Sequence, residues 1–94
     1  MSTKTTQIIN STTVLAGNIN IFLIDASAGD IILTLPYISQ DGQYYEFKRT
    51  DSSEKNVTIQ GYTAQQTING NPFIKFTAGS YNTFVSQNSV WYLL

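Results

Sequence analysis

The apolar positions of the chain fall into short runs that are separated by turn-forming residues. No segment keeps the period of an amphipathic helix long enough to predict one, whereas the runs fit strands. About eight short strands at close spacing, with Gly, Asn, Asp and Pro between them, predict an all-β fold, namely an antiparallel, jelly-roll-like β-sandwich. The predicted strands cover residues 12–15, 19–25, 31–35, 44–50, 57–61, 73–77, 81–86 and 90–94.

Two of these strands are apolar on both faces, in residues 22–24 and 31–33. A parallel sheet would bury both faces, but the crossover helices that usually accompany it are not predicted. Either some apolar side chains are exposed, as on most protein surfaces, or one face meets a second copy of the chain. The final run, residues 90–94, is also apolar on both faces, and this favours the second interpretation because a free apolar end would fray.

Local signals predict several turns and one buried face. Asp41-Gly42 is typical of the tight point of a β-hairpin. In the strand that follows, Tyr45, Phe47 and Arg49 alternate and are expected to share one face.

Length and composition point to one small domain that needs additional stabilisation. The 94 residues include no cysteine and no histidine, which excludes disulfides, thiolate metal sites and histidine chemistry. Self-association is then the leading way to complete the core of a chain of this size. We expect residues 1–11 to be a flexible lead-in and residues 12–94 to form the β-sandwich domain.

The charge balance excludes two classes of partner. Five Lys and Arg residues against six Asp and Glu residues give a net charge of −1, with no basic patch for nucleic acid or for anionic lipid. The chain has no run of about 18 apolar residues, so membrane insertion is not expected.

Catalysis is not expected either. A nucleophilic site would need Ser or Thr with a lysine base, and the acidic residues fall mostly in predicted turns. Asp25 and Asp30 could share a calcium ion, but a turn-stabilising role is the stronger interpretation. We therefore expect no enzyme activity, metal or cofactor.

Aromatic residues make up 13% of the chain and favour a binding role, because tyrosine offers a rigid ring with a polar end. Four tyrosines lie in or beside predicted loops, where they could contact a receptor or a glycan or simply cover the edges of the sandwich. These are Tyr37, Tyr44, Tyr62 and Tyr81.

Four segments resemble a recurring module of viral and phage fibres when taken in order. They are "LIDASAGDIILTLP", "GQYYEFKRTDSSEKNVTIQG", "TINGNPFIKF" and "SQNSVWYLL". Over residues 19–94 the chain is similar to the C-terminal head domains of giant-virus, virophage and tail-fibre proteins. The resemblance implies a homotrimeric β-sandwich head on the virion surface that attaches to a host or partner surface, with residues 1–11 as the junction to a shaft.

The sequence therefore predicts a non-catalytic fibre head. The alternatives are a monomeric carbohydrate-binding module and a structural capsid or tail component that binds another viral protein. The residues expected at the trimer interface are Phe22, Ile24, Ile32, Trp91 and Leu93.

Overall fold

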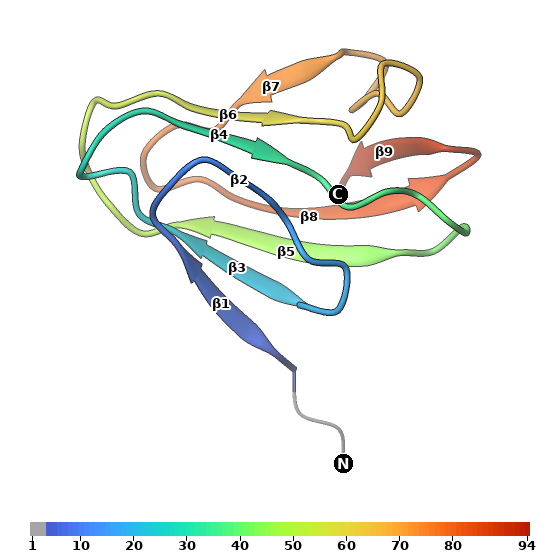
Figure 1. The fold of residues 1–94 in the computed structure, drawn as a ribbon, viewed down its shortest axis with the longest axis horizontal. Helices are drawn as coiled ribbons and strands as arrows, with labels where there is room; N and C mark the ends of the chain where they lie inside the picture. The colour runs from blue at the N-terminus through green and yellow to red at the C-terminus, as the bar shows by residue number, and fades with distance from the viewer. Residues whose placement is uncertain (1–3) are drawn as a thin grey trace.

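The computed structural model describes residues 4–94, and this part of the chain contains nine strands and no helix (Figure 1). The all-β prediction is confirmed, and each of the eight predicted strands overlaps one of β2 to β9. The strands are β1 (Thr6–Ile9), β2 (Thr13–Val14), β3 (Ile21–Ile24), β4 (Ile31–Thr34), β5 (Tyr44–Arg49), β6 (Val57–Gln60), β7 (Phe73–Lys75), β8 (Tyr81–Gln87) and β9 (Val90–Leu93).

Strand β1 lies within residues 1–11, which were expected to be a flexible lead-in. It pairs in parallel with β3, and Ile9 at its end is buried in the core. The expectation is therefore wrong for Thr6–Ile9, which belong to the folded domain, while residues 1–3 lie outside the described residues. The sequence did not predict this strand because it begins with the polar residues Thr6 and Gln7. It is held in place by backbone pairing with β3 and by the buried side chain of Ile9.

The strands form two sheets, with the orders β1-β3-β5-β8-β9 and β2-β4-β6-β7. From β1 to β6 the chain alternates between the sheets, and each return places a strand parallel to the preceding one in its sheet. Only the pairs β5–β8, β6–β7 and β8–β9 are antiparallel. The prediction of antiparallel pairing is thus wrong for the four pairings among β1 to β6, where crossing to the opposite sheet replaces the crossover helix of ordinary parallel sheets.

The expected hairpin at Asp41-Gly42 is also absent, since β4 and β5 lie in different sheets. Gly42 has a φ of 84°, so the local conformation is the turn that the sequence indicated, but it serves a crossing connection. The hairpin between β8 and β9 instead turns through Asn88 and Ser89, with φ values of 52° and 62°. These positive values match the turn class that best fits the twist of paired strands.

The last strand of the five-stranded sheet is covered along its outer edge. The Trp91 amide donates to the Thr67 carbonyl over 2.8 Å, and the Asn69 amide donates to the Trp91 carbonyl over 2.8 Å. The Asn69 side-chain oxygen accepts from the Leu93 amide. Residues 67–69 thereby satisfy backbone groups of β9 that would otherwise be open to another strand.

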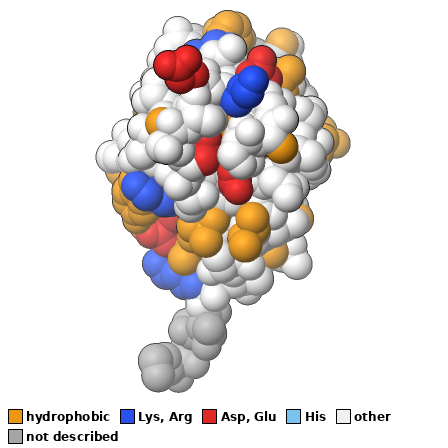
Figure 2. Space-filling model, turned by 90° about the vertical axis from the view of Figure 1, so that its left-hand side faces the viewer, with side chains coloured by type: hydrophobic (Ala, Val, Ile, Leu, Met, Phe, Trp, Pro, Cys, Tyr) orange, Lys and Arg blue, Asp and Glu red, His pale blue; other side chains and the backbone are white. Residues whose placement is uncertain are grey.

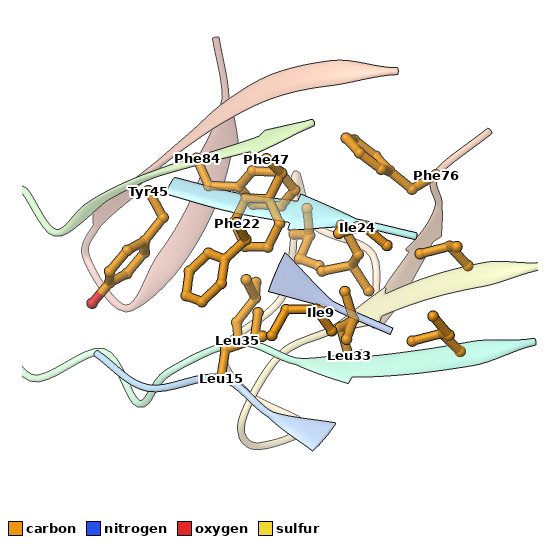
Figure 3. Packing of buried hydrophobic residues seen from close by; sticks show 14 of the residues in the cluster. Ile9, Leu15, Phe22, Ile24, Leu33, Leu35, Tyr45, Phe47, Phe76 and Phe84 are labelled. Atoms are coloured by element: carbon orange, nitrogen blue, oxygen red, sulfur yellow. The ribbon is translucent and has the colours of Figure 1, made fainter. Parts of the chain in front are cut away.

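The core lies between the two sheets, as Figure 3 shows. Phe47 of β5 packs against Phe22 of β3 and Phe84 of β8, with ring centroids 5.0 Å and 4.7 Å apart. Leu33 and Ile59 face them from the four-stranded sheet and are fully buried. A sandwich-like arrangement of two mixed sheets is therefore the fold of the described chain.

Candidate functional site

The outer face of the five-stranded sheet carries apolar side chains on every strand. The register aligns Ile8, Leu23, Lys48 and Tyr81 in one row across β1, β3, β5 and β8. Ile8 is 69% exposed, and Tyr81 is 56% exposed. We name this surface the apolar face and define it by Ile8, Ile21, Leu23, Tyr44, Tyr81, Val85 and Tyr92.

Three charged side chains lie on or beside the apolar face: Lys4 and Glu46 pair with each other, and Lys48 donates to the Gly79 carbonyl over 3.0 Å. Lys4 Nζ lies 2.8 Å from Glu46 Oε2, and the Tyr81 hydroxyl donates to Glu46 Oε1 over 2.7 Å. The Lys4 hydrogen bond, followed by that of Tyr81, lowers the pKa of the Glu46 carboxyl. In turn, the Glu46 carboxylate raises the pKa of Lys4 and of Tyr81. The single carboxylate of the face is therefore neutralised locally.

The outer face of the four-stranded sheet is more polar at its centre. Gln60 Nε2 donates to Thr34 Oγ1 over 3.1 Å, and Lys75 Nζ donates to Thr58 Oγ1 over 2.9 Å. These polar pairs join the central strands β4 and β6 to each other and to β7. Exposed apolar side chains lie beside these polar groups, at Val14 across from Thr34, Ile32 across from Thr58 and Phe73 across from Gln60.

The five residues expected at a trimer interface do not lie together. Phe22, Ile24 and Trp91 are fully buried within a single chain, so they are core residues and their assignment to an interface is corrected. Leu93 is partly buried against the same core, while Ile32 is exposed on the four-stranded sheet.

The error concerns which side of β3 faces outward. Phe22 and Ile24 point inward, whereas Ile21 and Leu23, which the interface prediction omitted, point outward. The signal was the uninterrupted apolar run, but both sets of alternating positions in it are apolar, so the pattern alone does not say which set is inside.

Two of the predicted loop tyrosines meet at one end of the sandwich. The alternating path brings the connections β2–β3, β4–β5 and β6–β7 to the same end, on the right of Figure 1. Tyr37 and Tyr62 come from the second and third of these connections, and their rings meet edge to face with centroids 5.6 Å apart. Both rings are about half exposed, at 55% and 52%.

These rings border a cleft of about 370 Å³, which we name the tyrosine cleft. None of its lining residues is acidic or basic, so its surface carries no formal charge at neutral pH. It is lined by Leu15, Gly17, Pro36, Tyr37, Ser39, Gln40, Gln43, Tyr45 and Tyr62.

Gln43 fixes the loop that forms one wall of the tyrosine cleft. Its Oε1 accepts from the backbone amides of Ser39 and Gln40, over 2.6 Å and 3.1 Å. Its Nε2 donates to the Tyr37 carbonyl and to the Tyr45 hydroxyl, and that hydroxyl donates to the Gly17 carbonyl. The sequence did not single out Gln43, whose role depends on contacts that only the fold creates.

The other two predicted tyrosines, Tyr44 and Tyr81, lie on the apolar face. The set of four is therefore divided between two different surfaces, one a cleft and the other a sheet face.

The opposite end of the sandwich contains a buried ion pair. Arg49 Nε lies 3.0 Å from Asp51 Oδ1, and both side chains are almost completely buried. Arg49 also donates to the carbonyls of Phe76 and Lys55, each over 2.7 Å. This guanidinium, together with further hydrogen bonds, holds the pKa of Asp51 well below its usual range.

A cavity of about 220 Å³ adjoins this pair, lined in part by Lys55 and Lys75. The Arg49 donors are used within the chain, and Asp51 also accepts from the Ala26 amide, so the pair joins the connections β3–β4, β5–β6 and β7–β8. At this end of the molecule, positive and negative side chains lie beside one another on a mainly uncharged surface (Figure 2). The burial of Arg49 confirms that it shares a face with Tyr45 and Phe47.

Asp25 stabilises a turn, as expected, whereas Asp30 joins the β3–β4 connection to the β5–β6 connection. Asp25 Oδ1 accepts from the Ser27 amide, and hydrogen bonding by the Ser27 side chain, followed by that of its amide, lowers the pKa of the Asp25 carboxyl. Asp30 Oδ1 accepts from the Asn56 amide over 2.8 Å. Within residues 4–94, no three His, Cys, Asp or Glu side chains gather in a metal-binding group.

The same described residues include no helix that is long and apolar enough to cross a membrane. No family model and no curated protein matches this chain. Its function must therefore be inferred from the geometry of the apolar face and of the tyrosine cleft.

Proposed function

We propose that this chain is a non-catalytic fibre head of a virus or phage, which assembles as a homotrimer on the virion surface and attaches to a host or partner surface. The observation that carries the assembly is the apolar face, to which all five strands of one sheet contribute. The fibre context rests on the resemblance of residues 19–94 to fibre heads.

An exposed apolar surface of this kind favours association, because covering it removes hydrocarbon from water. Ile8, Leu23 and Tyr92 lie on three different strands of the same sheet, so they present one surface. The Lys4–Glu46 pair at this surface is already neutralised, which lowers the cost of covering it, and the Lys48 ammonium already donates to the Gly79 carbonyl. Three copies around a rotation axis would cover equivalent surfaces and form a closed assembly.

The test is the mass of the protein in solution, measured by light scattering after size exclusion at micromolar concentration. We expect three times the chain mass of 10.5 kDa. Ile8→Asp, which places a charge in the apolar face across from Leu23, should produce monomers because it buries an unpaired carboxylate in the interface.

Ile32→Asp is the matched control, because Ile32 is an exposed isoleucine on the other sheet. This variant should remain trimeric. A wild-type protein that is monomeric at these concentrations would overturn the assembly, and loss of the trimer only in Ile32→Asp would assign it to the four-stranded sheet.

A second candidate function is that of a monomeric carbohydrate-binding module. The tyrosine cleft favours it, because the cleft is formed within one chain and combines two exposed rings with uncharged polar groups. A monomer that retains sugar binding would support this function over the fibre head.

A further inference from the structure

We propose that the tyrosine cleft binds a neutral pyranose sugar, with Tyr37 and Tyr62 as the walls against which the sugar ring packs. The inference deepens the attachment part of the proposed function by naming the class of ligand. It rests on that function only for its biological context, since the cleft is complete within a single chain.

The two rings form a corner. Their planes meet at 85°, with the centroids 5.6 Å apart, so a ligand in the cleft can contact the face of one ring and the edge of the other. A pyranose suits such a corner, because it has an apolar C–H face and a rim of hydroxyl groups. Aromatic rings provide the apolar contact, and the phenol oxygens provide polar ends.

The hydrogen-bonding groups of the cleft divide into used and free groups. Gln43 and the Tyr45 hydroxyl are occupied by contacts within the chain, which keep the wall in place before a ligand arrives. The side-chain amide of Gln40 and the hydroxyls of Tyr37 and Tyr62 have no hydrogen-bond partner among residues 4–94. They are free to bond the hydroxyl groups of a sugar.

The charge and size of the cleft restrict the ligand further. No acidic or basic side chain lines it, so it offers no counter-ion for a sialic acid, a phosphate or an amine. Its volume of about 370 Å³ lies at the small end of the range for ligand sites. A proline-rich peptide would also pack on tyrosines, but it requires an extended groove with aromatic ridges. The perpendicular rings form a compact corner and thus favour the sugar.

The fold supplies an optical reporter for binding. Tyr45 lines the cleft and its ring centroid lies 5.6 Å from that of Trp91, the single tryptophan of the chain. A ligand that contacts Tyr45 should therefore change the fluorescence of the buried Trp91. The amides of Ser39 and Gln40, which are bonded to Gln43, should report the same event in NMR spectra.

The experiment titrates isotope-labelled wild-type protein with methyl β-glucoside, methyl β-galactoside, N-acetylglucosamine and N-acetylneuraminic acid. We expect at least one neutral sugar to shift the Ser39 and Gln40 amides and to change Trp91 fluorescence, with a dissociation constant on the order of 1 mM for a single small ring. N-acetylneuraminic acid, which is anionic, should bind more weakly.

Two substitutions test the assignment of the walls. Tyr37→Ala and Tyr62→Ala should each weaken binding by about tenfold, whereas Tyr37→Phe should retain most of it because the ring remains. Phe73→Ala is the matched control: Phe73 is an exposed ring on the four-stranded sheet, outside the cleft and the apolar face, and its removal should leave sugar binding unchanged.

Three results would overturn the inference: no response to any neutral sugar up to on the order of 100 mM, stronger binding of the anionic sugar, or a response to a proline-rich peptide alone. The outcome is separable from that of the assembly. A trimeric protein that binds no sugar would contradict only the proposed ligand of the cleft. A monomeric protein that binds a sugar would contradict only the proposed trimer.

Discussion

The outer faces of the two sheets differ, although both are built by the same alternating chain. On the five-stranded sheet every strand contributes an apolar side chain, and the single carboxylate, Glu46, is paired with Lys4. On the four-stranded sheet the central strands carry Thr34, Thr58 and Gln60, which bond to neighbours within the face. The second face mixes these polar pairs with exposed apolar side chains at Val14, Ile32 and Phe73, whereas on the first face all five strands present hydrocarbon to solvent, so covering the first gains the larger free energy.

Trp91 and Tyr92, which are adjacent in β9, provide the largest test of this difference because they point to opposite sides of the sheet. Trp91→Ala should lower the free energy of unfolding by about 3–5 kcal/mol, because the indole is fully buried. Tyr92→Ala should cost the isolated chain less than about 1 kcal/mol but weaken the assembly. Denaturant unfolding and light scattering measure the two effects. Equal losses of stability would place both rings in the core.

Lowering the pH should destabilise the protein mainly by protonating Asp51, which pairs with the buried Arg49. Protonation of Glu46, which pairs with the exposed Lys4, should have a smaller effect. Both carboxyls have a pKa that the fold lowers, so each contributes stability above the unfolded value of about 4. That contribution is lost progressively as pH falls below this value and through the folded pKa. The loss from Asp51 is the larger one, because its partner Arg49 is buried while Lys4 is exposed.

Melting temperatures between about pH 2 and pH 7 check this expectation. Asp51→Asn should be less stable at neutral pH, because Arg49 loses its counter-ion, and should show a much smaller acid-induced decrease. Glu46→Gln is the control and should keep most of that decrease. If Glu46→Gln instead abolished the acid-induced decrease in melting temperature, the Lys4–Glu46 pair on the apolar face would control stability in acid.

The smallest expected effect concerns the turn that aligns two strands of the apolar face. Ser89 has a φ of 62°, in a region that glycine adopts without steric cost. Ser89→Gly should raise the free energy of unfolding by roughly 0.5–1 kcal/mol, measured in denaturant. Gly70→Ala, at a φ of 84° in the turn beside β9, should lower it by a comparable amount. A destabilised Ser89→Gly would mean that the serine side chain compensates for the strain.

The sequence could locate the strands because their apolar runs and turn residues are local properties. It could not pair them, because Asp41-Gly42 indicates a turn but not whether the two strands that it joins lie in one sheet or in two. Similarly, the run Ile21–Ile24 is apolar at every position, so only packing against the opposite sheet decides that Phe22 and Ile24 are inside. Strand β1 was missed because its stability comes from backbone pairing to β3.

The candidate sites show the same limit. Tyrosine content and loop positions indicated a binding surface, but only the crossing connections bring Tyr37 to Tyr62 and separate them from Tyr44 and Tyr81. Arg49 was predicted on the face of Tyr45 and Phe47, and its counter-ion Asp51 stands two residues later. A local sequence pattern does not show that the pair is bidentate. It also does not show that Arg49 donates to the carbonyls of Phe76 and Lys55.

The alternating path of β1 to β6 also orders the steps of folding. None of these six strands pairs with its neighbour in sequence, so each ladder among them closes a loop that passes through the opposite sheet. Strands β8 and β9, by contrast, are joined directly by Asn88 and Ser89 and pair at low entropic cost. We therefore expect the C-terminal hairpin to form first and β5, β3 and β1 to add to it in that order.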